Sequence, residues 1–561
     1  MKTLSDQVVQ ILFDAGVKRA YGVPGDAIDL ILAAIHQRPD FDFYLTRHEE
    51  GAGFMASAHA KLTGEMGVVL ASQGPGCAHL LESMYDAKMD KVPMLVITGQ
   101  VESARIGTNT VQEINQILLF DDVACFNREV RSANNLIDIL QLALQMARVK
   151  RGVAHVSIST DILRMPSFPY IPNKPIYHLH YDIVPHDNVI QQAADILNTH
   201  ENIAILYGGG CLHAREALLN VATLLAAPLI HTVRSKDIID NHHPHYAGGI
   251  GMKGSHNGCH YVKHCDALII VGCSFAWREF YPEDVPIIQI DIDPERIGVR
   301  CRIESALLGD AKLTLELLAK KLHQKNNTNF LQHAQKAHLD AIHALNKKAA
   351  LRDDTLPIDS PVLTRIISQN LKEDAIVTVD AGTVSVWANN WLLLNGKQRL
   401  IGSTELGTLG FGMPAAIGCQ IAMPDRQVVA LCGDGGFQMT MGDFSTAVKY
   451  QLPIIVIIYN NFSYHFIELE QMKEGVAQCY TKLTNPDYAK VAEAFGGVGI
   501  RVTKASDIEP AIQKAFTCKQ PCIVDVLTNP NELIQPSKLS FSLVTHFIEG
   551  MVKTKLSKSN D

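Results

Sequence analysis

Residues 428–436, Val428-Val429-Ala430-Leu431-Cys432-Gly433-Asp434-Gly435-Gly436, join an apolar run to a glycine-rich turn. A second apolar run, Ile454 to Tyr459, ends in Asn460-Asn461, and Asn461 lies 27 positions after Asp434. Short apolar runs that end in turn residues are typical of buried strands. If the two runs are neighbouring parallel strands, Asp434 and Asn461 meet at one carboxyl edge, where open α/β sheets bind ligands.

The residue types at this edge suit a phosphorylated ligand and a hard cation. Glycines let the backbone approach phosphate groups closely and present N–H donors to them. The Asp434 carboxylate and the Asn461 amide oxygen suit Mg²⁺, which takes few protein ligands and shares phosphate oxygens. The alternative is an ordinary strand-to-helix turn followed by an Asn-Asn loop, because short motifs also arise by chance.

Strand-like runs alternate with helical patterns in three blocks, which indicates α/β domains with parallel sheets. We expect domains at residues 1–172, 183–335 and 357–530, followed by a tail at 531–561. A proline-rich linker begins at Pro166, and a polar segment at 320–355 predicts a helix plus a connector. The expected strands are Gly67–Ala71, Met94–Thr98, Ala154–Ile158, Ile203–Tyr207, Ala267–Val271, Ile287–Ile290, Ala375–Val379, Gln427–Leu431, Ile454–Tyr459 and Cys522–Val526.

The composition is that of an acidic globular chain. Its 561 residues favour three to four domains at roughly 150 residues each. Hydrophobic residues make up 47% and charged residues 19%, which excludes a disordered chain. A formal net charge of −8 argues against nucleic acid as the main partner, because such proteins need a basic face.

The sequence also bears on location. Met1 to Asp6 lack the basic and apolar pattern of a signal peptide, and no uncharged apolar stretch reaches about 18 residues. The 12 cysteines form no CxxC pair and are expected to be buried apolar residues. We therefore expect a cytoplasmic protein.

Further motifs are spread along the chain. They are Arg47-His48-Glu49-Glu50-Gly51, Gly74-Pro75-Gly76, Phe280-Tyr281-Pro282, Gln289-Ile290-Asp291-Ile292-Asp293-Pro294, Asp380-Ala381-Gly382-Thr383, Gly407-Thr408-Leu409-Gly410, Gly442-Asp443-Phe444 and Phe541-Ser542-Leu543. Together with Gly433–Gly436, this set resembles the thiamine-diphosphate-dependent pyruvate oxidase family, and within it the quinone-dependent pyruvate dehydrogenases. The resemblance implies three doubly wound parallel-sheet domains that bind the pyrimidine, FAD, and the diphosphate with Mg²⁺, in that order.

The resemblance also implies roles for single residues. Glu49, supplied by another subunit, would contact the pyrimidine nitrogen, and the family pattern selects it over Glu50. Leu409 stands where the family usually has a Met that bends the cofactor. The implied metal ligands are Asp434, Asn461 and the carbonyl of Ser463. The other implied thiamine diphosphate contacts are Gly25, Gly382, Thr383, Gly407, Thr408, Gly435, Gly436 and Ile467.

Four residues are expected to line the reaction site by resemblance. His79 and Gln112 would face the substrate, although a lone histidine is often structural. Val111 replaces the aromatic residue that the family has before Gln112. Phe466 and Glu470 match pyruvate oxidases, whereas acetolactate synthases usually carry Met and Trp in this segment. The alternative for Phe466 is plain core packing.

The middle block resembles the FAD segments of the oxidase branch. Glycines after a strand are a weak signal alone, so a middle domain without flavin is the alternative. The implied FAD contacts are Gly208, Arg234, Gly251, Met252, Lys253, Gly254, Ser274, Phe275, Ala276, Trp277, Arg278, Asp291 and Asp293. A nearby group, His256, Cys259, His260, His264 and Cys265, has partial zinc spacing but is interpreted as structural.

The implied activity is oxidative decarboxylation of pyruvate to acetate and CO₂, with electrons passed through FAD to a quinone. A phosphate- and oxygen-dependent pyruvate oxidase, acetolactate synthase, a non-oxidative decarboxylase and a catalytically silent scaffold are the alternatives. The family implies a homotetramer. Tail residues at four-residue spacing (Val544, Ile548, Val552 and Leu556), followed by lysines, predict an amphipathic helix. Such a helix either touches the inner face of the cell membrane or packs on its own domain.

Overall fold

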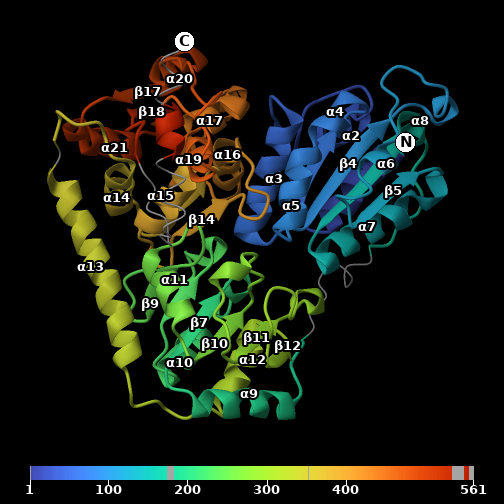
Figure 1. The fold of residues 1–561 in the computed structure, drawn as a ribbon. Helices are drawn as coiled ribbons and strands as arrows, with labels where there is room; N and C mark the ends of the chain where they lie inside the picture. Colours follow the sequence, from blue (N-terminus) through green and yellow to red (C-terminus); the bar gives the residue numbers. More distant parts are fainter. Residues whose placement is uncertain (1, 173–181, 352, 533–548, 555–561) are drawn as a thin grey trace.

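A computed structural model describes residues 2–172, 182–351, 353–532 and 549–554. Its strands form three six-stranded sheets, one in each block of the sequence (Figure 1). All pairs of named strands are parallel, and helices flank each sheet. The predicted α/β class with three doubly wound parallel sheets is therefore confirmed.

The N-terminal sheet has strand order β2-β1-β3-β4-β6-β5. Its strands are β1 (Arg19–Gly22), β2 (Asp42–Leu45), β3 (Gly67–Ala71), β4 (Met94–Gln100), β5 (Phe126–Val130) and β6 (Val153–Ser159). Its helices are α1 (Leu4–Asp14), α2 (Asp29–His36), α3 (Glu49–Thr63), α4 (Pro75–His79), α5 (Leu81–Met89), α6 (Gln116–Leu119), α7 (Leu136–Lys150) and α8 (Thr160–Arg164).

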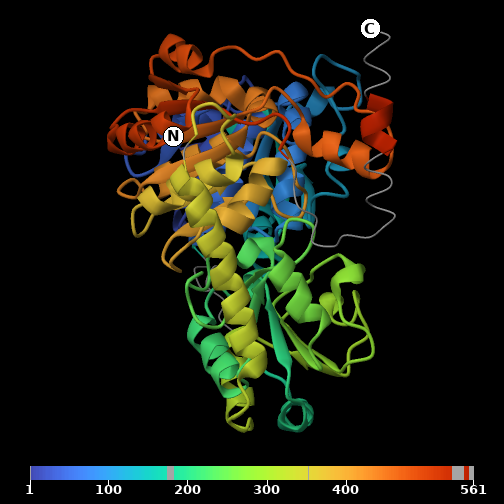
Figure 2. The same cartoon turned by 60° about the vertical axis from the view of Figure 1, so that its left-hand side comes forward.

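The middle sheet has the order β12-β11-β10-β7-β8-β9. Its strands are β7 (Ile203–Tyr207), β8 (Leu229–His231), β9 (Tyr246–Gly249), β10 (Ala267–Val271), β11 (Ile287–Asp291) and β12 (Ser305–Leu308). Its helices are α9 (Asp187–Thr199), α10 (Arg215–Leu224), α11 (His256–Lys263) and α12 (Ala311–Ala319). The predicted polar helix is α13 (Asn329–Leu351), which runs from this domain to the C-terminal domain (Figure 2).

The C-terminal sheet has the order β14-β13-β15-β16-β18-β17. Its strands are β13 (Ile376–Val379), β14 (Arg399–Gly402), β15 (Val428–Gly433), β16 (Ile455–Asn460), β17 (Val498–Val502) and β18 (Cys522–Leu527). Its helices are α14 (Ser360–Asn370), α15 (Thr383–Trp391), α16 (Gly412–Ala422), α17 (Asp434–Thr440), α18 (Phe444–Lys449), α19 (His465–Lys473), α20 (Tyr488–Phe495) and α21 (Ile508–Thr517).

All ten strands expected from apolar runs are present, with ends shifted by at most two residues. Each sheet also contains one reversal of strand order, between β1 and β3, between β7 and β10, and between β13 and β15. Connections leave such a reversal in opposite directions and open a crevice at the carboxyl edge. By this rule, the fold offers one candidate ligand-binding edge in each domain.

The N- and C-terminal domains meet through α3 and α16. A Cβ built on Gly418 would lie 2.3 Å from the Met55 carbonyl oxygen, so the two helix backbones are in close contact. Phe54 and Phe411 pack edge to face beside this contact, with ring centroids 5.5 Å apart. Because the contact depends on a residue without a side chain, it fixes the distance between the two domains.

A buried ionic group joins all three domains. The Lys61 ammonium lies 2.8 Å from Asp86 and 2.6 Å from Asp90, and it donates to the Gly402 carbonyl. Arg234 of the middle domain lies 3.8 Å from Asp90. Both carboxylates are almost fully buried, and removing one partner of such a group costs about 3–5 kcal/mol.

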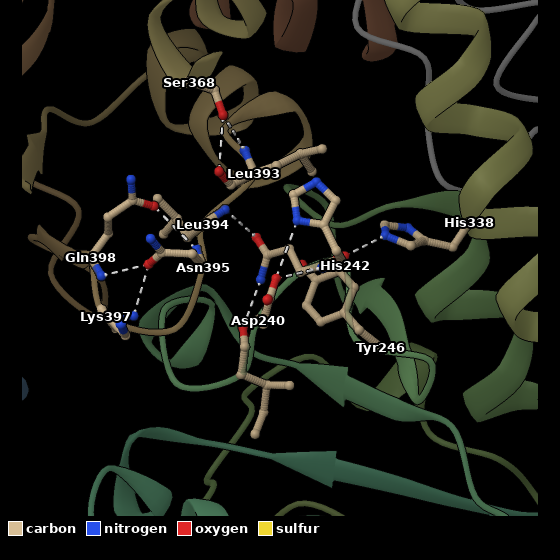
Figure 3. Close-up of polar contacts among 12 residues, drawn as sticks. Asp240, His242, Tyr246, His338, Ser368, Leu393, Leu394, Asn395, Lys397 and Gln398 are labelled. Atoms are coloured by element: carbon tan, nitrogen blue, oxygen red, sulfur yellow. Dashed lines mark hydrogen bonds and ion pairs between the residues drawn. The ribbon is translucent and has the colours of Figure 1, made fainter. Parts of the chain in front are cut away.

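The middle and C-terminal domains are also joined through Asn241, which is fully buried. Its side-chain oxygen accepts from the Leu394 amide (3.0 Å), and its carbonyl accepts from His338 of α13 (2.9 Å). Figure 3 shows Leu394 and His338 approaching this point from opposite sides. Helix α13 therefore spans the junction between the middle and C-terminal domains and is also hydrogen-bonded to it.

No helix in the described ranges is long and apolar enough to cross a bilayer. Of the predicted tail helix, only residues 549–554 are described, so Val544, Ile548 and Leu556 lie outside the described part. Lys553 donates to the Gly475 carbonyl (2.8 Å), directly after α19. The described end of the tail therefore contacts its own C-terminal domain.

We expect Gly418→Ala to destabilise the protein by about 1–3 kcal/mol, because overpacking forces the backbones apart. Alanine is otherwise the better helix former by about 1 kcal/mol, so the sign of the change separates the two effects. Chemical denaturation measures the difference, and Gln513→Ala on the exposed side of α21 is the control. A stabilised Gly418→Ala protein would contradict the close contact.

Candidate functional site

Strands β15 and β16 are parallel neighbours, with Gly433 in register with Tyr459. The prediction that Asp434 and Asn461 share one carboxyl edge is therefore confirmed. The Phe462 amide donates to Asp434 Oδ2 (2.7 Å), and the Ser463 amide donates to Asn461 Oδ1 (3.1 Å). The loop at 461–463 is thus folded onto Asp434.

This oxygen-rich group fits a hard cation. The Asp434 carboxylate accepts hydrogen bonds from the amides of Gly435 and Phe462 and from Asn485. Hard cations such as Mg²⁺ are bound through carboxylate and carbonyl oxygens of this kind. Burial raises the pKa of Asp434 in the absence of a cation. Asp434, Asn461 and the Ser463 carbonyl would hold Mg²⁺ at this position.

Asn485 is a residue that sequence reasoning missed. Its amide nitrogen donates to Asp434 Oδ2 (2.7 Å) and to Asn460 Oδ1 (2.9 Å), so it links the ends of β15 and β16. Its oxygen accepts from Gln438 (3.1 Å). The residue lies in the loop before α20, where no local motif marks it. Such a partner orients the primary ligand and typically changes metal affinity 10–100-fold.

The glycines of the same edge leave room for a ligand. A Cβ built on Gly407 or Gly433 would meet nothing within 4 Å, and one on Gly382 would meet only Leu409, at 4.0 Å. Gly382 directly precedes α15, whose first amides face this edge. The predicted contacts Gly382, Thr383, Gly407 and Leu409 are therefore brought together around open space.

Gly436 is required for a different reason. A Cβ at this position would lie 2.2 Å from Asp380 Oδ2, which is buried and without a hydrogen-bond partner. Burial raises the pKa of Asp380 to about 7. Gly435 is similarly crowded by the Tyr464 ring, at 2.5 Å. Gly436 therefore allows the turn to pack on Asp380 at the end of β13, and Gly435 allows the Tyr464 ring to pack on the turn.

In the N-terminal domain, Glu49 is the first residue of α3, and His79 is the last residue of α4. Their side chains meet, with His79 Nδ1 2.9 Å from Glu49 Oε2. His48 stacks on His79 with ring centroids 4.3 Å apart. The structure thus pairs two residues that the sequence analysis selected separately. Their catalytic roles stay predictions.

A carboxyl cluster lies behind Glu49. Burial, with Glu82 and Asp443 nearby, raises the pKa of Glu50 to about 7. Asp443 of the C-terminal domain accepts from the Arg47 amide (2.8 Å), just before α3. The Thr408 hydroxyl donates to Glu82, so Thr408 contacts the N-terminal domain of its own chain. This cluster fixes the start of α3 against the C-terminal domain.

Gly25 and Gln112 follow strands β1 and β4 of the N-terminal sheet. A Cβ on Gly25 would lie 2.5 Å from the Ser72 Cβ, so only glycine fits there. Gln112 has a φ of 63°, a left-handed conformation that side-chain-bearing residues adopt at a cost of roughly 1–2 kcal/mol. Such strain is concentrated at functional sites.

Helix α19 carries the residues that favoured oxidation. Phe466 is half-buried against the C-terminal core, Ile467 is 46% exposed and Glu470 is exposed. The partial burial of Phe466 agrees with the packing alternative as well as with a role beside a cofactor. The helix start is fixed by Glu468, which His465 (3.1 Å) and Lys482 (2.7 Å) both contact.

The predicted FAD segments all follow strands of the middle sheet. Because these strands are parallel, the segments collect at one edge. They are Gly208 after β7, Arg234 after β8, Gly251-Met252-Lys253-Gly254 after β9, Ser274-Phe275-Ala276-Trp277-Arg278 after β10, and Asp291 with Asp293 at the end of β11. A Cβ on Gly208 would lie 2.4 Å from the Gly272 carbonyl, so backbone meets backbone at the reversal point.

Some of these side chains already have partners. Asp293 pairs with Lys91 of the N-terminal domain (3.0 Å), and Ser274 Oγ accepts from Arg296 (3.1 Å). Burial favours the neutral form of Asp293, but Lys91 and nearby amides hold its pKa below the usual range. Burial raises the pKa of Asp291, whose carboxylate accepts from the Asp293 amide (3.0 Å). Within the described residues, Asp291 forms no ion pair, unlike Asp293.

The histidine- and cysteine-rich group on α11 contains a stacked pair, His260 and His264, with centroids 4.1 Å apart. Within the described ranges, the single group of three or more side chains spaced to hold a metal ion is His48, Glu49 and His79. The α11 group is therefore interpreted as structural.

Helix α15 connects the edges of the middle and C-terminal sheets. Asn389 and Asn390 donate to the Lys253 carbonyl (2.6 and 3.0 Å), in the loop after β9. The first residue of the helix, Thr383, borders the space around Gly382. At 1.5 Å per residue, Thr383 and Asn389 lie about 9 Å apart along the helix axis. Helix α15 therefore runs from the Gly382 edge of the C-terminal sheet to the loop after β9 of the middle sheet.

Three family models match the chain. They describe the N-terminal TPP binding domain (residues 2–119), the central domain (190–318) and the C-terminal TPP binding domain (380–526) of a thiamine pyrophosphate enzyme. The Bacillus subtilis thiamine pyrophosphate-containing protein YdaP is 38% identical, covering 98% of this chain and 96% of its own. Pyruvate oxidase of Lactiplantibacillus plantarum is 30% identical (96% and 90%), and the Escherichia coli acetolactate synthase isozyme 3 large subunit is 28% identical (95% and 96%).

We expect Asn485→Ala to weaken Mg²⁺-dependent thiamine diphosphate binding 10–100-fold, because Asp434 loses the partner that orients it. Isothermal titration calorimetry with and without Mg²⁺ measures the effect. Asn370→Ala, which removes a side-chain bond to the Ile366 carbonyl in the same domain, is the control. Equal affinities for the two variants would remove Asn485 from the metal site.

Proposed function

The chain belongs to the thiamine pyrophosphate enzymes, and on that basis we propose that it decarboxylates pyruvate or a closely related 2-oxo acid oxidatively, using FAD. The observation that carries this proposal is the pair of crevices joined by α15. One has oxygen donors that suit Mg²⁺ and a diphosphate, and the other has glycines at its carboxyl edge, where a dinucleotide would bind.

Bound thiamine diphosphate supplies a nucleophilic carbon that adds to a 2-oxo acid and takes up the electron pair left by CO₂. The C-terminal domain would hold its diphosphate through Gly382, Thr383, Gly435 and Gly436, with the cation on Asp434, Asn461 and Ser463. Leu409, which lies against Gly382, would support the bent cofactor. Thr408 and Ile467 would border the same space, and Gly25 would reach it, like Glu49, from the N-terminal domain of another subunit.

Glu49 would hold a proton at the pyrimidine ring nitrogen. Its contact with His79, 2.9 Å away, fixes the carboxylate in one orientation and offers a second protonatable group beside it. We propose that the partner subunit in a homo-oligomer, expected to be a tetramer, supplies this pair to the site. The polar contacts described for Glu49 within its own chain lie in the N-terminal domain, not at Asp434.

Exposed apolar side chains support assembly of this kind. Val111 (84% exposed) and Leu118 (73%) lie on the segment that contains Gln112. Met439 (56%), Ile467 (46%) and Tyr480 (102%) lie on the segments before and after the proposed metal-binding loop at 461–463. Apolar groups gathered at a site are typical of surfaces that another protein covers. In the oligomer, the exposed apolar residues around Gln112 of one subunit would pack against those around the 461–463 loop of the other.

FAD supplies a two-electron acceptor close to the reaction site. Helix α15 joins the space around Gly382 to the loop after β9, which favours electron transfer between the two cofactors within one chain. Arg234, Arg278 and Asp291 would contact the pyrophosphate, the ring or the ribose. A quinone is the acceptor we propose for the reduced flavin, with oxygen as the alternative, in a cytoplasmic protein whose tail makes peripheral contact with the membrane.

Acetolactate synthase is the second candidate, because relatives of that name match the chain over the same length. Phe466 and Glu470 favour oxidation over the joining of two oxo acids. His79, Gln112, Phe466 and Glu470 would line the substrate site in either case. The two activities differ in what pyruvate does to the flavin.

We expect the enzyme reconstituted with thiamine diphosphate, Mg²⁺ and FAD to lose its flavin absorbance when pyruvate is added without oxygen, and to regain it with a quinone. Anaerobic absorption spectroscopy measures this, with CO₂ release followed in parallel. Bound flavin that stays oxidised while acetolactate forms would identify a synthase. Failure to bind flavin would exclude the oxidase.

We expect Glu49→Gln to retain both cofactors and to lose turnover at least 100-fold, because the amide cannot exchange a proton with the ring nitrogen. Steady-state CO₂ release measures turnover, and calorimetry measures cofactor affinity. Glu474→Gln, at the exposed end of α19, is the control. Near-normal turnover in Glu49→Gln would assign the proton to another group.

A further inference from the structure

The side chain of Gln112 is held by a second glutamine, Gln73, which no motif singled out. Gln73 lies just beyond the carboxyl end of β3 and is 5% exposed. Its amide nitrogen donates to Gln112 Oε1 (3.0 Å) and to Asp26 Oδ1 (3.0 Å). Its amide oxygen accepts from the Ser72 hydroxyl (2.6 Å). Each of these hydrogen bonds joins the Gln73 amide group to a neighbouring residue, and together they fix its orientation.

These contacts decide which way each amide points. Asp26 Oδ1 accepts the hydrogen bond that it shares with Gln73, so the amide nitrogen of Gln73 faces it. The second hydrogen on that nitrogen then points at Gln112, and only the oxygen of Gln112 can accept it. The Gln112 amide nitrogen is left without a partner among the described residues. Its two N–H groups are turned away from Gln73.

The backbone is built around this contact. Gly74, with a φ of 62°, lies against Gln112, and a Cβ built on it would be 3.0 Å from the Gln112 Cβ. Gln112 itself takes a left-handed φ of 63°. Asp26 and Ser72 follow β1 and β3, on either side of the strand reversal. We call Asp26, Ser72, Gln73 and Gln112 the relay, because hydrogen bonds join them in sequence. The relay lies at the carboxyl edge of the N-terminal sheet and places Gln112 at the margin of that edge.

We propose that Gln73 is a positioning residue, which forces Gln112 to present N–H donors to the substrate and so selects substrates with acceptor oxygens in that place. The carboxylate and carbonyl of a 2-oxo acid have that chemistry, whereas an ammonium group, which only donates, does not. The inference rests on the proposed function and adds the source of its selectivity.

The test compares two Gln→Leu variants in the same domain. Gln73→Leu removes the relay. Gln7→Leu removes an equally buried glutamine (5% exposed), which exchanges two hydrogen bonds with the Phe168 backbone. We expect Gln73→Leu to raise the KM for pyruvate at least tenfold, with kcat changed less than threefold and thiamine diphosphate affinity unchanged. Gln7→Leu should leave the KM unchanged. Equal KM values for the two variants would overturn the proposal.

A double-mutant cycle separates positioning from general damage. If Gln73 acts through Gln112, Gln73→Leu should raise the KM no further in a Gln112→Ala background. Additive effects of the two substitutions would overturn the proposal. Gln73→Asn, which keeps an amide, should recover part of the lost affinity.

Crystal structures test the role of Gln73 independently of the proposed reaction. If the parent enzyme consumes no 2-oxo acid, the proposed function fails, and the relay is still tested by the position of Gln112. We expect the Gln112 amide within 3.2 Å of Gln73 in the parent protein and rotated away in Gln73→Leu. An unmoved Gln112 side chain in the variant would overturn the inference whatever the activity.

Discussion

The rest of this structure depends on one constraint, the parallel direction of every strand in each sheet. Parallel strands all end at the same edge, so residues far apart in sequence are delivered to one line. The strand order then reverses once in each sheet, and the loops on either side separate to leave a crevice. Asp434 and Asn461 become neighbours for this reason, and Gly208 and Asp291 reach the same edge of the middle sheet on either side of β10.

The sequence was sufficient for the central strands and insufficient for the outer ones. Buried strands such as β7 and β10 are continuous apolar runs, and their ends were predicted to the residue. The unpredicted strands include all six sheet edges: β2, β5, β9, β12, β14 and β17. An edge strand has a neighbour on one side only, so its sequence is mixed. Asp42–Leu45, with an exposed aspartate, shows no run to recognise.

The candidate site divides in the same way. Ligand atoms on motif residues, such as the Asp434 carboxylate, were predictable because their chemistry is local. Their supporting residues were not, because Asn485 and Gln73 act through contacts that only the folded chain creates. The meeting of His79 with Glu49 was unforeseen for the same reason. The distances between these side chains are set by the fold of the sheet edge, and no local pattern in the sequence predicts them.

The central claim is that one chain holds two cofactors at the edges joined by α15, and a crystal structure with thiamine diphosphate, Mg²⁺ and FAD tests it most directly. We expect a metal ion at about 2.1 Å from a side-chain oxygen of Asp434, a side-chain oxygen of Asn461 and the Ser463 carbonyl oxygen. We also expect flavin density along the middle-sheet edge between Gly208 and Asp291, facing α15. A metal bound elsewhere, or a middle-sheet edge that stays empty with saturating FAD, would contradict the central claim.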